Sequence, residues 1–105
     1  MALVDVNEGR EAEFMTLART LASLILRKGY GRAVTVRDEA VPSRFYTVRH
    51  WSTAAAAEQC HGDAESQAVT ARLYQIARVT QVVNASKGVH AVLRHDALRG
   101  VPRRA

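Results

Sequence analysis

The chain contains 105 residues, of which 48% are hydrophobic and only 6% aromatic, and it carries a formal net charge of +5. This length predicts one small domain, which we place at residues 1–85, followed by a basic C-terminal tail at residues 86–105, partly ordered or flexible. Because the tail has five basic residues against one acidic residue while the domain is close to neutral, the charge pattern excludes a nucleic-acid reader, which would carry a basic folded body.

The N-terminal part of the chain predicts a strand followed by a long amphipathic helix. Residues 2–6 have the composition of a short strand. Residues 10–28 repeat apolar side chains at the three- and four-residue steps that line one helical face. The side chains of this apolar stripe are Phe14, Leu17, Ala18, Leu21, Leu24 and Ile25. Gly29 is expected to end the helix in the left-handed conformation.

The next two segments predict a hairpin of two strands. Residues 32–39 and 44–51 favour strands, and the turn between them contains Pro42, which lacks a backbone donor. Side chains alternate between the two faces of a strand. On the second strand, the residues expected to share one face are Phe45, Thr47, Arg49 and Trp51, and those expected on the other face are Tyr46, Val48 and His50.

The remainder of the domain predicts a helical region and a last strand. Ser52 is expected to cap a helix that opens with a run of alanines, and Asp63 to cap a second segment over residues 64–76. The valines of residues 77–85 favour a strand. Further on, residues 90–93 fit either a short strand or a short helix, and residues 101–105 are expected to be disordered.

This order of elements predicts an α+β, ferredoxin-like fold. A β-α-β-β-α-β chain forms a four-stranded antiparallel sheet with both helices on one face. No element remains to cover the other face, so we expect a second copy of the chain to cover it. Two sheets paired face to face would make a dimeric α/β barrel, and a homodimer has the commonest closed symmetry.

The sequence FYTVRHWSTAAAAEQCHGDAE, from Phe45 to Glu65, resembles the antibiotic-biosynthesis-monooxygenase type of dimeric α/β-barrel domain. In that family a strand ends in tryptophan, and a capped, alanine-rich helix follows. The segment from Gly9 to Phe14, in which Glu-x-Phe opens the long helix, is similar as well, so the resemblance covers roughly residues 2–85. It implies a homodimer with a pocket between the sheet and the helices of each subunit.

The resemblance also implies an activity. In the quinone-forming members of the family, a pocket asparagine, tryptophan and arginine hold a phenolic polyketide, and oxygen reacts with this substrate without metal or flavin. The resemblance therefore implies a cofactor-independent monooxygenase that acts on a small phenolic or polyketide-like aromatic. Trp51 occupies the tryptophan position, whereas Thr47 stands where those members tend to carry asparagine. A hydroxyl can donate one hydrogen bond there but lacks the geometry of an amide.

The candidate site residues come from the strand ending in Trp51 and from the helices expected to cover it. The candidate catalytic residues are Trp51, Thr47, Arg72 and His61, and the candidate ligand-binding residues are Phe45, Arg49 and Tyr74. His61 is the candidate general base, because neutral imidazole accepts protons near pH 7. Two roles remain open for Arg49, which either binds an anionic or phenolate ligand or pairs with a carboxylate such as that of Glu58.

Other functions of the same fold are considered beside the oxygenase. A non-oxidative protein that binds or cyclises a small aromatic and a purely structural dimerisation domain both stay open. Haem degradation is rejected, because Cys60 and Thr70 stand near the positions where the haem-degrading members carry a second tryptophan and a haem-ligating histidine. No metal site is expected, because Cys60 and His61 are adjacent and no metal-ligand motif is present.

The localisation is expected to be cytoplasmic, without membrane association. The first residues lack the basic region and the long apolar core of a signal peptide. The longest apolar run, LASLIL, is far shorter than the ~20 residues of a spanning helix. The single cysteine, Cys60, excludes an internal disulfide and fits a reducing compartment.

Overall fold

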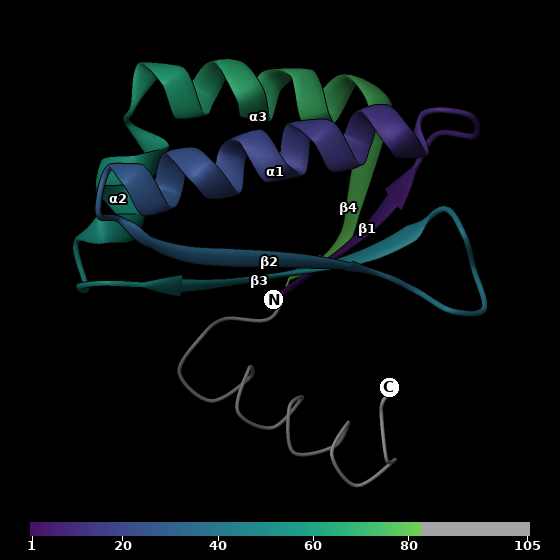
Figure 1. Ribbon diagram of the computed structural model, residues 1–105, viewed down its shortest axis with the longest axis horizontal. Helices are drawn as coiled ribbons and strands as arrows, with labels where there is room; N and C mark the ends of the chain where they lie inside the picture. Colours follow the sequence, from purple (N-terminus) through teal and green to yellow (C-terminus); the bar gives the residue numbers. More distant parts are fainter. Residues whose placement is uncertain (83–105) are drawn as a thin grey trace, which may run out of the picture.

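The computed structural model describes residues 1–82, which form an α+β fold with a four-stranded antiparallel sheet (Figure 1). The elements in chain order are β1 (Ala2–Val6), α1 (Glu11–Arg27), β2 (Gly31–Arg37), β3 (Arg44–Trp51), α2 (Ala56–His61), α3 (Ala64–Ile76) and β4 (Ala77–Val82). The predicted ferredoxin-like order is confirmed, with the second helical region divided into α2 and α3. The predicted end of the last strand at residues 83–85 and the predicted tail at residues 86–105 lie outside the described residues.

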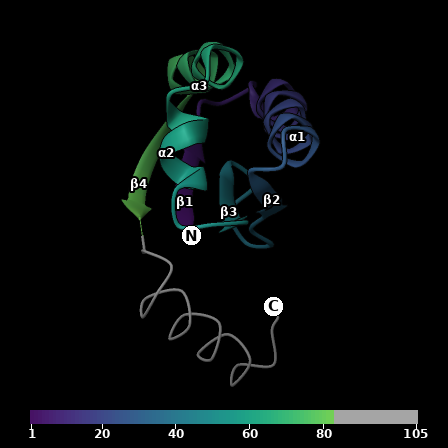
Figure 2. The same cartoon turned by 90° about the vertical axis from the view of Figure 1, so that its left-hand side faces the viewer.

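The sheet has the strand order β2-β3-β1-β4, and neighbouring strands run antiparallel. Because β3 lies between β2 and β1, Thr47 is flanked by Thr35 on one side and by Ala2 on the other. Trp51, at the end of β3, lies opposite Gly31 at the start of β2. Helices α1 and α3 lie side by side over one face of the sheet (Figures 1 and 2).

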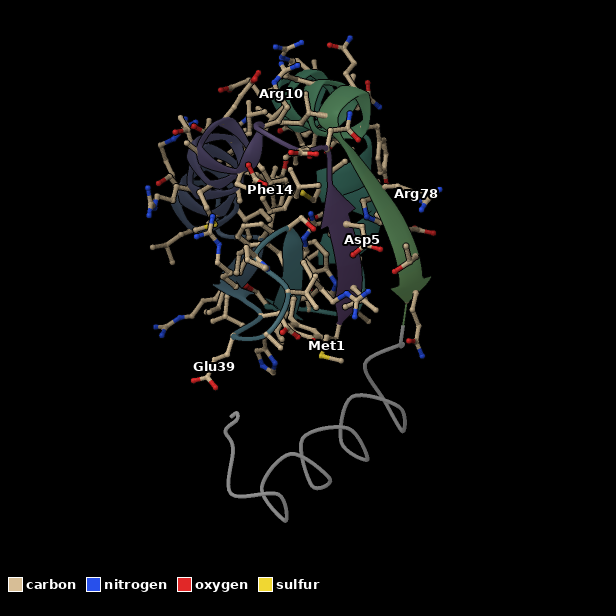
Figure 3. The ribbon with its side chains drawn as sticks, turned by 90° about the vertical axis from the view of Figure 1, so that its right-hand side faces the viewer. Met1, Asp5, Arg10, Phe14, Glu39 and Arg78 are labelled. Atoms are coloured by element: carbon tan, nitrogen blue, oxygen red, sulfur yellow. The ribbon has the colours of Figure 1, made fainter. Side chains whose placement is uncertain are left out.

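The two faces of the sheet differ in burial. On the face toward the helices, Phe45 is fully buried and lies 4.8 Å, centroid to centroid, from the ring of Phe14. Phe14 projects from α1 into the interior (Figure 3). On the opposite face, Val34 is 61% exposed and Val36 is 52% exposed. The alternation expected for β3 therefore places Phe45 in the core, and Val34 and Val36 are exposed on the far face of the sheet.

The helix ends are formed partly as expected. Gly29, which follows α1, has a φ of 75°, the left-handed conformation that ends a helix. Ser52 was predicted to cap the next helix, and this is wrong: α2 begins at Ala56 without a side-chain cap. The Ser52 hydroxyl donates instead to the carbonyl of Gly29 at 2.9 Å, and its N–H donates to the carbonyl of Tyr30 at 2.8 Å. These bonds attach the end of β3 to the loop after α1. Within residues 1–82, each helix falls short of the length and hydrophobicity needed to cross a bilayer.

Within residues 1–82, the core contains two apolar clusters that include side chains of α1. The first contains buried residues of β1, α1, β3 and α3, namely Val4, Val6, Phe14, Phe45 and Ile76. The second contains the buried residues Leu21, Ile25 and Cys60, against which Tyr30 and Trp51 pack. Leu73 of α3 contacts both clusters. The Cys60 thiol lies 3.4 Å from the Ser66 hydroxyl, so this cysteine is a buried packing residue between α2 and α3.

Asp63 connects the start of α3 to the end of α1. As predicted, it is the N-cap of α3, and its carboxylate accepts a bond from the N–H of Ser66 at 3.1 Å. The same carboxylate accepts bonds from the Lys28 ammonium at 2.6 Å and from the Tyr30 hydroxyl at 2.9 Å. The Lys28 ammonium, followed by the Ser66 N–H, lowers the pKa of Asp63 to about 2.

The low pKa of Asp63 predicts a pH-dependent contribution to stability. A carboxyl whose pKa is lower in the folded state stabilises the fold above its unfolded pKa, near 3.8, and this contribution is lost as the pH falls toward about 2. Thermal melts of wild type and Asp63→Asn should therefore differ most above pH 5 and converge between pH 4 and pH 2, because asparagine keeps the cap but not the charge. Glu39→Gln, at an exposed acid, is the control and should show no such gap. A gap for Asp63→Asn that does not change with pH would contradict the prediction.

Candidate functional site

A cavity of about 270 Å³ lies between the sheet and the helices. Strand side chains on the helix-facing side of the sheet form its floor, and side chains of α1, α2 and α3 complete the wall. Its apolar wall includes Val4, Phe14, Leu21 and Leu73, which belong to or pack against the two core clusters. Its polar lining side chains are Thr35, Thr47, Arg49, His61, Thr70 and Tyr74. A volume just below the ~300 Å³ lower end of small-ligand sites suits a small ligand.

Small side chains keep the cavity from being filled by the core. Alanines line it from both layers, namely Ala2, Ala18, Ala22, Ala33 and Ala77. Ala18 and Ala22 are one helical turn apart on α1, so they leave a shallow strip above the sheet. These alanines were not among the predicted site residues. The sequence pattern could have predicted them, because an apolar helical stripe in which alanine replaces large residues leaves space beneath the helix.

Trp51 is both a core residue and a wall of the cavity. It packs against the cluster of Leu21, Ile25 and Cys60, and it lines the cavity beside them. The ring of His61 lies edge-on to the Trp51 ring, with centroids 6.0 Å apart and an interplanar angle of 83°. This arrangement positions the imidazole of α2 against the aromatic wall that ends β3.

The hydroxyl of Thr47 is hydrogen-bonded to the hydroxyl of Thr35 on β2. Its Oγ1 lies 3.1 Å from Oγ1 of Thr35, and both residues line the cavity. In a pair of hydroxyls one proton occupies the bond between them, so one O–H group remains to donate to a ligand. Thr35 was not among the predicted site residues, although its alternation with Val34 and Val36 placed it on the same side as Ala33. The threonine pair is thus the neutral hydrogen-bonding group of the cavity floor.

Arg49 lines the cavity without an ionic partner among residues 1–82. None of the ion pairs in this part of the chain includes it, and its Nε is buried without a hydrogen-bond partner there. The expected alternative, pairing with Glu58, is therefore not observed, since Glu58 lies exposed on α2. The charge of Arg49 also acts on the α-amino group of Met1, whose pKa is lowered first by burial and then by Arg49. Both causes favour the neutral form of the amino group, so the positive charge at this part of the cavity is that of Arg49.

His61 and Tyr74 belong to the rim of the cavity. Tyr74 is 64% exposed and Val82 is 65% exposed, and both line the cavity, as does the exposed His61. Residues that line a cavity and also face solvent mark where it opens. The position of His61 at this opening is the one expected for a base that exchanges protons between a bound ligand and water.

Two predicted site residues lie away from the cavity. Phe45 is fully buried in the first core cluster beneath it and does not line it. Arg72 was expected to reach the pocket, but its guanidinium pairs with Glu13 of α1 and donates to Gln75 at 2.6 Å. The helical turn between Arg72 and Tyr74 explains the difference, because residues two apart on a helix point to different sides. In this arrangement Arg72 links α3 to α1 on the surface.

The described residues offer little for a metal ion. Within residues 1–82, no three side chains of His, Cys, Asp or Glu are grouped closely enough to hold one. The chemistry that the cavity offers comes from one guanidinium, one imidazole, an indole wall and the hydroxyls of Thr35, Thr47, Thr70 and Tyr74. These groups suit the binding of an aromatic compound that carries a hydroxyl or an anionic group.

The family model of the antibiotic biosynthesis monooxygenases matches residues 1–72, which is more than half of the chain. The chain belongs to the antibiotic biosynthesis monooxygenase family. This family membership confirms the resemblance that was based on the segment ending in Trp51 and on the start of the long helix. Among curated proteins, no sequence matches the chain significantly.

Three solved structures have the same fold as this chain. A conserved protein of unknown function from Bacteroides thetaiotaomicron, proposed to be an oxidoreductase, aligns with a TM-score of 0.70 and 16% identity, over 75% of this chain and 85% of its own. SnoaB, a cofactor-independent oxygenase from Streptomyces nogalater, aligns with a TM-score of 0.63 and 13% identity, over 82% and 93%. A candidate antibiotic biosynthesis monooxygenase from Deinococcus radiodurans aligns with a TM-score of 0.62 and 14% identity, over 80% and 90%. At these identities the likeness concerns the fold alone.

Proposed function

We propose that this member of the antibiotic biosynthesis monooxygenase family is a cofactor-independent monooxygenase that oxidises a small phenolic or polyketide-like aromatic in the cavity between sheet and helices. The observation that carries the proposal is the cavity itself. The sheet side of this cavity presents the indole of Trp51, the hydroxyl pair of Thr35 and Thr47, and the guanidinium of Arg49, whose Nε has no partner within residues 1–82. Family membership supports a monooxygenase-like reaction, and the fold is shared with a cofactor-independent oxygenase.

The proposed reaction needs only the substrate and molecular oxygen. A phenol that loses its O–H proton becomes an electron-rich phenolate, and a ring carbon of the phenolate forms a bond to oxygen. Cleavage of the O–O bond then releases one oxygen atom as water together with two hydrogens of the substrate, and the other atom becomes the second carbonyl oxygen of a quinone. The aromatic ring is oxidised and oxygen is reduced, so phenol and oxygen balance against quinone and water.

The residues of the cavity have complementary roles in this proposal. His61 accepts the phenolic proton at the opening and passes it to water. Arg49 holds negative charge carried by the substrate, which a cation stabilises more strongly in a cavity than in water. The free O–H of the Thr35–Thr47 pair donates to an oxygen of the reacting group. Trp51 holds the ring of the substrate in place.

Two other functions remain as alternatives on the same fold. A protein that binds or cyclises an aromatic without oxidation would use the same cavity, and Thr47 in place of asparagine favours it. A domain used only for association would need no cavity, so the space of about 270 Å³ argues against it. Oxygen consumption separates the first alternative from the proposal.

The test is oxygen uptake with a series of one- to three-ring phenols, using protein treated with a metal chelator. The expected result is uptake with formation of a quinone, and a loss of about tenfold or more in kcat/KM for Trp51→Leu, because the ring contacts of the indole are removed. Leu26→Ala, at an apolar residue of α1 that is 61% exposed, is the matched control and should keep wild-type activity. Binding of phenols without any oxygen uptake would support the non-oxidative alternative and reject the monooxygenase.

We also propose that the chain forms a homodimer through the open face of the sheet, giving the dimeric α/β barrel. Val34 and Val36 expose apolar surface there, and cross-strand neighbours on β3, Val48 and Tyr46, continue the face. Contiguous exposed apolar surface of this kind is typical of an interface. Light scattering of the wild-type protein measures the proposed state directly, and a mass of one chain would reject it.

A further inference from the structure

Arg49 has a buried side-chain nitrogen that residues 1–82 leave without a hydrogen-bond partner. Its Nε is buried and has no partner among residues 1–82, although a guanidinium has five N–H donors and stays charged at any working pH. The cross-strand neighbour on β2 is Ala33, which offers no acceptor side chain. Buried polar nitrogen atoms normally have a hydrogen-bond partner, so a buried Nε without one indicates a partner from outside this part of the chain.

The lining of the cavity favours an anion as that partner. Within residues 1–82, no aspartate or glutamate lines the cavity, whereas Arg49 and the first residue, Met1, both do. An anionic group placed here would therefore meet positive charge and no negative charge from the described cavity wall.

The rest of the wall selects an aromatic ring. The side chains that line the same cavity include Trp51, Phe14 and Leu73. An inorganic anion would leave this apolar surface uncovered. A planar ring carrying a carboxylate would cover it and would present two oxygens to the planar fork of the guanidinium.

We infer that the ligand of this cavity is a small aromatic carboxylate, bound with its carboxylate on Arg49 and its ring against Trp51. The inference rests on the proposed function, because it narrows the substrate from a phenolic aromatic to a phenolic acid. A carboxylate is preferred to a phenolate because it is ionised at neutral pH, whereas a phenol with a pKa of ~10 is not. The free hydroxyl of the threonine pair then remains for the phenolic oxygen.

Calorimetric titration with 2-naphthoate and 2-naphthamide tests the inference, because the two probes have the same ring and differ in charge. Charge-assisted hydrogen bonds should make wild type bind the acid about 10- to 100-fold more tightly than the amide. Arg49→Met should remove this preference, leaving acid and amide within about twofold, and Arg49→Lys should keep part of it because the charge remains. Arg19→Met, on an exposed part of α1, is the matched control and should keep the wild-type ratio.

Three results would overturn the inference. Equal binding of acid and amide by wild type would show that the charge of the ligand does not matter. An unchanged preference in Arg49→Met, with its fold confirmed by circular dichroism, would place the anion elsewhere. Absence of binding of both probes at millimolar concentration would reject the aromatic class. The wild-type comparison needs no variant, so it decides the matter even if Arg49→Met does not fold.

The same experiments separate this inference from the proposed oxygenase. Tight binding of 2-naphthoate with no oxygen uptake from any phenol or phenolic acid would keep the ligand class and reject the reaction. Oxygen uptake from neutral phenols at a rate unchanged by Arg49→Met would keep the reaction and reject the ligand class. If the oxygenase reaction and the ligand class are both correct, oxygen uptake should be faster for phenolic acids than for the matching phenols. This difference should be present in wild type and lost in Arg49→Met.

Discussion

Gly31→Ala is expected to destabilise the protein by about 3 kcal/mol or more, because no side chain fits at the start of β2. A Cβ built on Gly31 would lie 2.1 Å from the carbonyl oxygen of His50 and 2.9 Å from Cα of Trp51. Both atoms belong to backbone, so they cannot move aside as a flexible side chain could. Gly31 also has a φ of 155°, which lies in the region that non-glycine residues rarely adopt.

The effect of Gly31→Ala should extend to the cavity, because Gly31 and Trp51 are paired across the strands. Chemical denaturation followed by circular dichroism measures the stability, and Trp51 fluorescence reports the position of the cavity wall, since the chain has a single tryptophan. Gly29→Ala is the matched control: its φ is 75° and a Cβ added there would have nothing within 4 Å, so only the backbone cost of about 1 kcal/mol applies. A loss for Gly31→Ala no larger than that of the control would contradict the prediction.

The double substitution Val34→Glu and Val36→Glu is expected to convert the proposed dimer into a monomer. Both side chains point away from the helices and are more than half exposed, so glutamate fits the single chain without strain. Across a two-fold interface each carboxylate would meet apolar surface or a second carboxylate, and an unpaired charge buried in this way costs several kcal/mol. The measured mass should therefore fall from two chains to one in light scattering.

The control for this substitution is Leu26→Glu, at an exposed apolar residue on α1 and therefore outside the sheet. It adds the same kind of charge on the helix layer and should leave the mass of the protein unchanged. A dimer that survives the double substitution in β2 would show that the chains associate through another surface. Melting temperatures of both variants should be compared with wild type, because a monomer that also unfolds would point to lost stability of the subunit itself.

The sequence predicted the fold well because its local signals agree with one another. The stripe from Phe14 to Ile25 determined α1, and the alternation along residues 44–51 placed Phe45, Thr47 and Arg49 on the helix-facing side. Asp63 was found as a cap because its residue type and its position before an apolar segment are both typical of one. Each of these features depends on neighbours only a few residues away, which a sequence displays directly.

Ser52 shows where local signals fail. It has the residue type of a cap, but its hydroxyl donates to Gly29, which is 23 residues away in sequence. Arg72 is a similar case, because its partner Glu13 lies on another helix, 59 residues away. Long side chains choose partners by distance in space, and that distance is set by how α1 and α3 pack. The sequence alone therefore could not separate a pocket residue from a surface ion pair.

Residue types and short spacings were sufficient to predict the order of the elements, the faces of β3 and the family of the protein. Three features became visible only in the tertiary structure. A cavity remains between the layers, the hydroxyls of Thr35 and Thr47 are hydrogen-bonded, and Nε of Arg49 has no partner within residues 1–82. These features need strands and helices that are distant in sequence to meet at a fixed register and separation. The charge of Arg49 is visible in the sequence, but whether that charge is paired depends on what the fold places around it.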